Sequence, residues 1–175
     1  MAHTPSRTVY FTAAGKAGDF EVRGYRFRQV APPRGGGHVP ALAEYVSRVR
    51  AGDALVTVTD RERTLVDCLA RLDLGGGLDE LLRSAGGFTS VSAERVAAYT
   101  RLLGSPTFTA RAGWLMGMQR DAWRPAPEPL DATRRSLGRG TYWLERRRPG
   151  LEYTFVPEWR LYLPTAQPLR EWLAG

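Results

Sequence analysis

Two histidines and one cysteine are the side chains of this sequence best suited to acid–base, nucleophilic or metal chemistry. His3 lies near the start of the chain and His38 lies in a glycine-rich stretch, and neither has metal-ligand spacing from Cys68. The sequence also contains no G-x-S-x-G motif, no Walker lysine and no H-E-x-x-H motif. We therefore predict no catalytic residue, no metal site and no cofactor.

The acidic residues do not suggest a catalytic centre either. A nuclease assembled from Asp53, Asp60 and Asp67 would need a spacing that ties these carboxylates to one metal ion, and the sequence shows none. Cys68 falls near a stripe of leucines, a pattern that favours a buried, inert thiol. An enzyme is therefore the least supported class of function for this sequence.

The basic residues are more informative. The net charge is +7, and Lys16 is the only lysine among 25 basic residues. Arginine presents a planar fork of donors that suits phosphates and stacks on bases, although an arginine-rich genome composition explains the excess equally well. Residues 1–58 carry a net charge of +4, residues 59–100 of −2 and residues 101–175 of +5. Basic segments on both sides of an acidic one favour a placed anion-binding surface.

Six arginines and one acid fall within residues 134–148, and these arginines are our candidate surface for a nucleic acid or a protein partner. They are Arg134, Arg135, Arg139, Arg146, Arg147 and Arg148. Aromatic residues at 142, 143, 153, 155, 159 and 162 surround the last three. This mixture can bind nucleic acid by stacking and phosphate contact. Filling the core of a small sheet is the better explanation for most of the aromatics, and charges at a hairpin tip also protect strand edges.

Alternating β-branched and aromatic residues predict short strands in both end regions of the sequence. We predict strands over residues 7–12, over 20–30 with a tight turn or bulge at Gly24, and over 54–58. Residues 31–40 contain three prolines and three glycines and predict a loop, and residues 41–49 predict a short helix. Towards the end we predict strands over 141–147, 151–157 and 159–164. A hairpin turn at 147–150 would join the first two, and helical turns are predicted over 169–174.

From Thr59 onwards the apolar period changes from two to 3.6, which predicts helices. Thr59-x-x-Glu62 is a capping-box pattern, in which the threonine hydroxyl accepts the Glu62 backbone N–H. Three glycines at 75–77 predict the turn to a second helix, Ser92 and Gly104 bracket a third, and residues 107–121 predict a fourth. The predicted core positions are Leu65, Val66, Leu69, Leu72, Leu78, Leu81, Leu82, Ala85, Val96, Tyr99, Thr100, Leu103, Phe108, Ala112, Leu115 and Gln119. Ala110, Gly113 and Gly117 form a stripe of small residues that another element can approach closely.

Charged residues on these helices have structural interpretations. Arg63, Asp67 and Arg71 are spaced i, i+4, i+8, which predicts a ladder of ion pairs on a solvated face. Glu62 and Arg111 each lie beside an apolar stripe. They either form an internal ion pair that sets how two helices pack, or they only cap and snorkel. Thr59, Glu62, Asp67 and Arg111 are therefore predicted structural residues.

The order of these elements predicts an α+β fold with N-terminal strands, a central block of about four helices and a C-terminal antiparallel β-hairpin or sheet. We expect residues 1–6 to be a flexible tail. Residues 7–175 would form one domain with a β-rich part (7–58), a helical part (59–121) and a second β-rich part (130–175), with a proline-rich connector at 124–131. No stretch approaches the roughly 18 apolar residues of a membrane span, and no signal-peptide core is present. With a single cysteine, we expect a cytoplasmic protein without a membrane partner.

Four stretches of the sequence resemble one known family. "VTDRERTLVDCLARLDLGGGLDELL", then "ERVAAYTRLLGSPTFTARAGWLMG", then "YWL" and "WRLYLP" resemble the C-terminal region of the AbiEi antitoxin family of type IV toxin–antitoxin systems. The similarity covers roughly residues 55–164. The matching residues are Glu62, Arg63, Thr64, Leu65, Asp67, Leu69, Gly75, Gly76, Tyr99, Gly104, Ser105, Arg111, Gly113 and Leu115, with Trp159, Arg160 and Leu161 near the end.

The resemblance implies a non-enzymatic antitoxin and transcriptional regulator that is paired with a nucleotidyltransferase toxin and acts in phage defence. Type IV antagonism does not require a stable complex with the toxin. Members of the family usually carry an N-terminal winged helix-turn-helix that binds promoter DNA, and no such pattern precedes Thr59 here. Operator recognition by this chain alone is therefore left open, and the chain is either a stand-alone antitoxin domain or one whose partner supplies the DNA reader. The alternative is a general DNA- or RNA-binding protein that is unrelated to a toxin.

Overall fold

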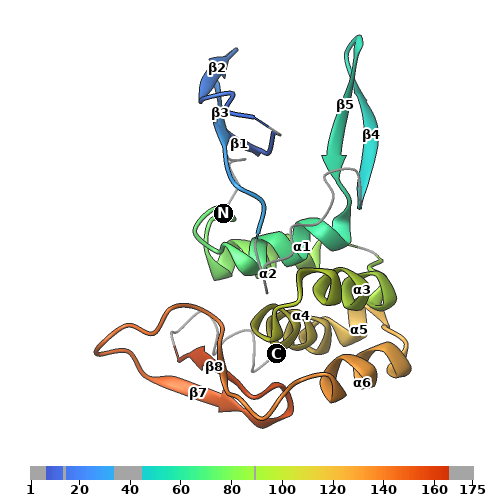
Figure 1. Cartoon of the computed structure of the whole chain (residues 1–175), viewed down its shortest axis with the longest axis vertical. Coiled ribbons are helices and arrows are strands. Elements are labelled where there is room, and N and C mark those ends of the chain that lie inside the picture. Colours follow the sequence, from blue (N-terminus) through green and yellow to red (C-terminus); the bar gives the residue numbers. More distant parts are fainter. Residues whose placement is uncertain (1–6, 14, 34–44, 89, 166–175) are drawn as a thin grey trace. The chain divides into compact units, whose positions relative to one another are not determined.

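A computed structural model describes residues 7–13, 15–33, 45–88 and 90–165 of the chain (Figure 1). These residues form six α-helices and eight strands in three small sheets, which confirms the predicted α+β class. By its contacts the chain divides into two compact units, residues 1–33 and 34–175, and we describe each by itself. None of the helices in the described ranges is long and apolar enough to cross a membrane. The predicted tail at 1–6 and the helical turns at 169–174 lie outside the described residues.

The first unit contains a three-stranded sheet of β1 (Thr8–Phe11), β2 (Phe20–Val22) and β3 (Tyr25–Gln29) in the order β1-β3-β2. Strand β1 runs parallel to β3, and β2 runs antiparallel to it. The predicted tight turn is confirmed, because Arg23 and Gly24 both have positive φ, which suits the two-residue turn of a hairpin. The register places Phe20 opposite Phe27, and their rings stack with centroids 4.8 Å apart.

The second unit begins with a hairpin of β4 (Val46–Ala51) and β5 (Ala54–Thr59), which pair antiparallel. The predicted strand at 54–58 is confirmed. The predicted helix at 41–49 is wrong for residues 46–49, which are a strand, whereas residues 41–44 lie outside the described part. The valines at 46 and 49 favour extended backbone, and Gly52 takes the left-handed conformation that the turn requires (φ 62°).

The helices are α1 (Arg61–Ala70), α2 (Leu78–Gly86), α3 (Ala93–Leu103), α4 (Pro106–Met118), α5 (Arg120–Trp123) and α6 (Pro127–Arg135). Nearly all the predicted core positions are buried or packed against the core. Leu72 also packs against the core, although it lies after the end of α1. Helix α4 is central, since it packs against α1, α3, α6 and the C-terminal strands (Figure 1). The predicted connector at 124–131 is wrong in part, because α6 begins there. Its prolines occupy the first turn, where the backbone N–H groups have no partner in the helix.

The C-terminal sheet consists of β6 (Tyr142–Trp143), β7 (Tyr153–Val156) and β8 (Leu161–Pro164), with a short 3-10 helix η1 (Pro157–Trp159) between the last two. The strand order is β6-β8-β7, with β6 parallel to β8 and β7 antiparallel to it. The predicted hairpin between residues 141–147 and 151–157 is therefore wrong, and the sheet is mixed. Leu161 and Leu163 of the central strand β8 are fully buried.

A close contact in the core joins η1 to α4. Trp159 is 1% exposed, and its ring lies on Gly113 of α4. A Cβ atom at Gly113 would come within 2.1 Å of the indole ring, so only glycine fits at this position. The predicted small-residue stripe is thus confirmed at Gly113, and the element that approaches it is the last turn before β8.

We predict that Gly113→Ala destabilises the protein by about 1–3 kcal/mol or more, because the added methyl group overlaps the indole ring. Gly117→Ala is the matched control. Its Cβ would lie 3.6 Å from the Trp159 indole nitrogen, an ordinary contact. Alanine also has the higher helix propensity, so this variant should be unchanged or up to about 1 kcal/mol more stable. Urea unfolding of both variants tests the contact, and equal stabilities would contradict it.

Candidate functional site

The first turn of α1 is capped by Asp60 rather than by Thr59. The Asp60 side chain accepts the Arg63 backbone N–H at 2.8 Å. Thr59 is the last residue of β5, and its hydroxyl lies 2.6 Å from that of Thr64. The predicted capping box is wrong because the extended strand continues through Thr59, so that the helix starts one residue later than the pattern indicated.

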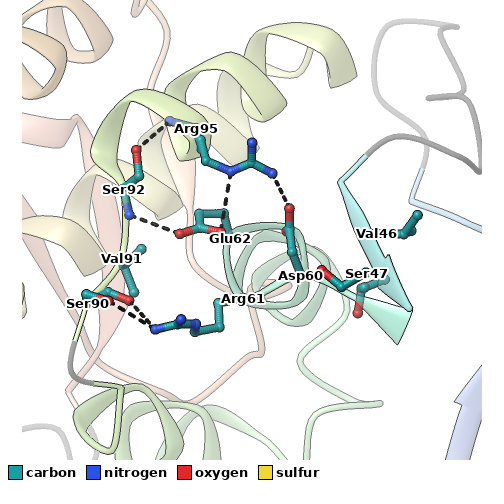
Figure 2. Close-up of a pocket in the computed structure, with 10 residues that line it drawn as sticks. Val46, Ser47, Asp60, Arg61, Glu62, Ser90, Val91, Ser92 and Arg95 are labelled. Carbon is teal, nitrogen blue, oxygen red and sulfur yellow. Dashed lines mark hydrogen bonds and ion pairs between the residues drawn. The ribbon is translucent and has the colours of Figure 1, made fainter. Parts of the chain in front are cut away.

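Glu62 joins α1 to the start of α3. It accepts the Ser92 backbone N–H at 3.0 Å, and Ser92 in turn caps α3 as predicted. Arg95 lies between Glu62, at 3.7 Å, and Asp60, to which it donates a hydrogen bond (Figure 2). The Arg95 guanidinium is 5.0 Å from the centre of the Tyr45 ring. The predicted Glu62–Arg111 ion pair is therefore wrong.

Arg111 instead bridges two backbone segments. Its guanidinium donates to the Leu69 carbonyl of α1 at 2.8 Å and to the Trp143 carbonyl of β6 at 2.9 Å. Burial lowers the pKa of Arg111, and the two carbonyl acceptors compensate part of the cost of placing the charge there. Arg111 is a structural residue, as predicted, but its partners are carbonyl groups that the sequence pattern does not reveal.

A buried polar cluster joins α1 to α3. Arg63 is 2% exposed, and its Nε atom lies 3.3 Å from an oxygen of Asp67. The Tyr99 hydroxyl donates to the other oxygen of Asp67 at 2.8 Å. Burial raises the pKa of Asp67 despite these two partners, and burial and the Asp67 charge together raise the pKa of Tyr99. The predicted Arg63–Asp67 pair is confirmed, but its place on a solvated face is wrong, because Arg63 faces the core. Arg71, the third residue of the predicted ladder, pairs with Asp73.

The Asp60–Glu62–Arg95 group borders a concave pocket of about 590 Å³. The pocket is lined by the start of β4, the end of β5, the first turn of α1 and residues 90–92 with Arg95 (Figure 2). Its polar groups largely satisfy one another, since Arg61 also donates to the Ser90 carbonyl at 3.0 Å. In the described ranges no group of three or more His, Cys, Asp or Glu side chains is placed to hold a metal ion. We interpret this pocket as the joint between hairpin and helices.

Cys68 is half-buried and packs against the core. Burial raises the pKa of its thiol, and the neighbouring Asp67 charge adds to this effect. A thiol with a raised pKa is a poor nucleophile at neutral pH, which agrees with the predicted inert cysteine.

The six predicted surface arginines are all exposed, and the structure places them in two groups. Arg134, Arg135 and Arg139 lie at the end of α6 and just after it, whereas Arg146–Arg148 lie between β6 and β7. Arg134 pairs with Asp131 and Glu158, and Arg148 pairs with Glu145. The other four form no ion pair with any residue that the structure describes, so their charges are available to a partner.

The aromatics near these arginines are the largest departure from the sequence prediction. Of the six that were expected mostly to fill a core, only Trp159 is fully buried. Trp143, Tyr153 and Tyr162 are half-buried and Phe155 is 39% exposed. Alternation along β8 turns Leu161 and Leu163 inwards, and this leaves the other face of the sheet to the aromatic rings.

We predict that Asp67→Ala lowers the free energy of unfolding by on the order of 3 kcal/mol, because it leaves the buried Arg63 charge without its carboxylate. Asp73→Ala, which removes the exposed partner of Arg71, should cost less than about 1 kcal/mol. Urea unfolding at neutral pH compares the two. A loss for Asp67→Ala no larger than that for Asp73→Ala would show that the buried pair does not hold the helices together.

No family model, no curated protein and no solved structure matches this chain. The similarity to the AbiEi antitoxins therefore depends on the quoted sequence blocks alone.

Proposed function

We propose that this chain is a non-enzymatic, antitoxin-like protein that counteracts a nucleotidyltransferase toxin. The proposal is supported by the role of the residues that carry the family resemblance. Asp67 and Tyr99 hold α1 to α3, Arg111 holds α1 to β6, and Gly113 admits Trp159. These side chains hold the elements of the fold together. A structural role of this kind fits the non-enzymatic function that the resemblance implies.

The contacts of Arg111 connect these elements to the exposed arginines at 146–148. It fastens the Trp143 carbonyl at the end of β6, and Arg146–Arg148 follow three residues later along the chain. The exposed arginines thus stand on a segment anchored to the helical block. In this proposal they contact the toxin or the toxin's target.

A role in transcription of the operon belongs to the same proposal. The described residues before α1 contain only strands, turns and loops, so promoter contacts would come from the arginine surface or from a partner protein that reads DNA.

Co-expression with the adjacent gene, which the proposal expects to encode a nucleotidyltransferase, tests the antitoxin function. We expect the neighbour to arrest growth alone and this chain to restore it. Replacing Arg146, Arg147 and Arg148 by alanine should abolish rescue while the protein stays folded, because these side chains make few internal contacts. The matched control replaces three exposed arginines of the helices, namely Arg83 of α2, Arg101 of α3 and Arg120 of α5. Full rescue by the first variant at normal abundance would exclude this arginine surface.

The second candidate function is nucleic-acid binding unrelated to a toxin. The observation that favours it is the set of exposed arginines without ion pairs in the described part of the chain. Binding to phosphates releases counterions, so log K should fall linearly with log salt, with a slope of about −0.7 to −0.9 per phosphate contacted. Fluorescence anisotropy between 50 and about 300 mM salt measures this slope. Affinity that does not change with salt, or no binding at all, would reject this function.

A further inference from the structure

The outward face of the C-terminal sheet carries a continuous set of aromatic rings. The strand register places Trp143 of β6, Tyr162 of β8 and Phe155 of β7 in one row across the sheet. Tyr153 lies two residues before Phe155 and so shares this face. We call these four residues the aromatic face.

The rings of the aromatic face touch one another. Trp143 and Tyr162 stack with centroids 4.5 Å apart and an angle of 20° between the planes. Tyr153 meets Trp143 edge-on at 4.9 Å, and Phe155 lies 4.9 Å from Tyr162. All four remain at least partly exposed, although aromatic side chains contribute most when buried. A contiguous exposed apolar patch of this kind commonly marks a binding surface.

An arginine loop borders the aromatic face. The guanidinium of Arg147 lies 5.8 Å from the centre of the Trp143 ring. The backbone N–H of Arg148 donates to the Tyr153 hydroxyl at 2.8 Å, which fastens the loop to the edge of the aromatic face. Arg146 is exposed and has no ion pair among the described residues. The sheet therefore presents aromatic surfaces and unpaired cations side by side.

We propose that this face binds single-stranded nucleic acid, with unpaired bases stacking on the aromatic face and phosphates contacting Arg146 and Arg147. Base–aromatic stacking needs a base whose face is free, which a duplex does not offer in its interior. The arginines supply the charge complementarity that an uncharged apolar partner would not use. The inference deepens the nucleic-acid-binding function proposed above by naming the strand state and the residues that select it.

The test is fluorescence anisotropy with a labelled 12-nucleotide oligo-dT, a 12-nucleotide oligo-U and a duplex of the same length. We expect the full chain to bind either single strand about tenfold or more tightly than the duplex. Phe155→Leu combined with Tyr162→Leu should weaken single-strand binding by about tenfold or more and leave the weak duplex binding unchanged. Thermal melts establish that the variant is folded.

Matched controls separate stacking from charge. Phe20→Leu combined with Tyr25→Leu removes two exposed aromatics of the first unit and should leave affinity unchanged. Replacing Arg146 and Arg147 by alanine should weaken binding to all three oligonucleotides and flatten the salt dependence.

Two results would overturn the inference. Equal binding of single strand and duplex, unaffected by Phe155→Leu with Tyr162→Leu, would leave the nucleic-acid function standing and reject the aromatic face as its site. No binding to any oligonucleotide would reject both. A concentration-dependent dimer in sedimentation velocity that this double variant abolishes would then assign the aromatic face to a second copy of the chain.

Discussion

The pair of hydrogen bonds made by the half-buried Arg111 guanidinium is the interaction on which the arrangement of the second unit most depends. A charge that leaves water must find acceptors, and Arg111 finds one carbonyl in α1 and one in β6. These two acceptors belong to segments far apart in the sequence, so one side chain fixes the helical block against the first strand of the C-terminal sheet. Two residues further along α4, Gly113 contacts the Trp159 ring and so holds η1, directly before β8, against the same helix.

The polar contacts of α1 work together in a similar way. Asp60 caps α1 and also binds Arg95. Glu62 accepts the backbone N–H of Ser92, the residue that caps α3. One turn later Asp67 receives both the Arg63 guanidinium and the Tyr99 hydroxyl. A dense acidic and basic stretch thus becomes a set of internal contacts between helices. The residues of this stretch therefore have structural roles between the helices.

The arginines of the second unit fall into two groups, one that makes contacts inside the fold and one that is exposed. Arg63 and Arg111 make contacts within the fold, Arg63 with Asp67 and Arg111 with two backbone carbonyls. The arginines at 146–148 lie on a loop beside the aromatic face. The first group positions the second, because the strand that leads to this loop is held by Arg111. The arginines of this loop are exposed, and each of the two proposed functions assigns them to contact with a partner.

The helices could be predicted from the sequence because the apolar period and the cap residues are local. Leu65, Leu69 and Leu103 are buried where the period put them, and Ser92 and Gly104 bracket α3 as expected. The partners of the charged residues were not predictable, because Arg111 binds carbonyl groups, which every residue carries. Helix α6 was missed because its prolines read as a connector, although they occupy a first turn that tolerates them.

The sequence by itself determined the apolar positions of α1 to α4 that face the core and that arginine dominates the basic charge. Only the tertiary structure decided that β8 lies between β6 and β7, since strand order depends on packing between distant residues. That order also decided which face of the sheet carries the aromatic side chains. With Leu161 and Leu163 turned towards α4 and its neighbours, the pleat of the sheet left Tyr162 and the rings beside it on the outer face.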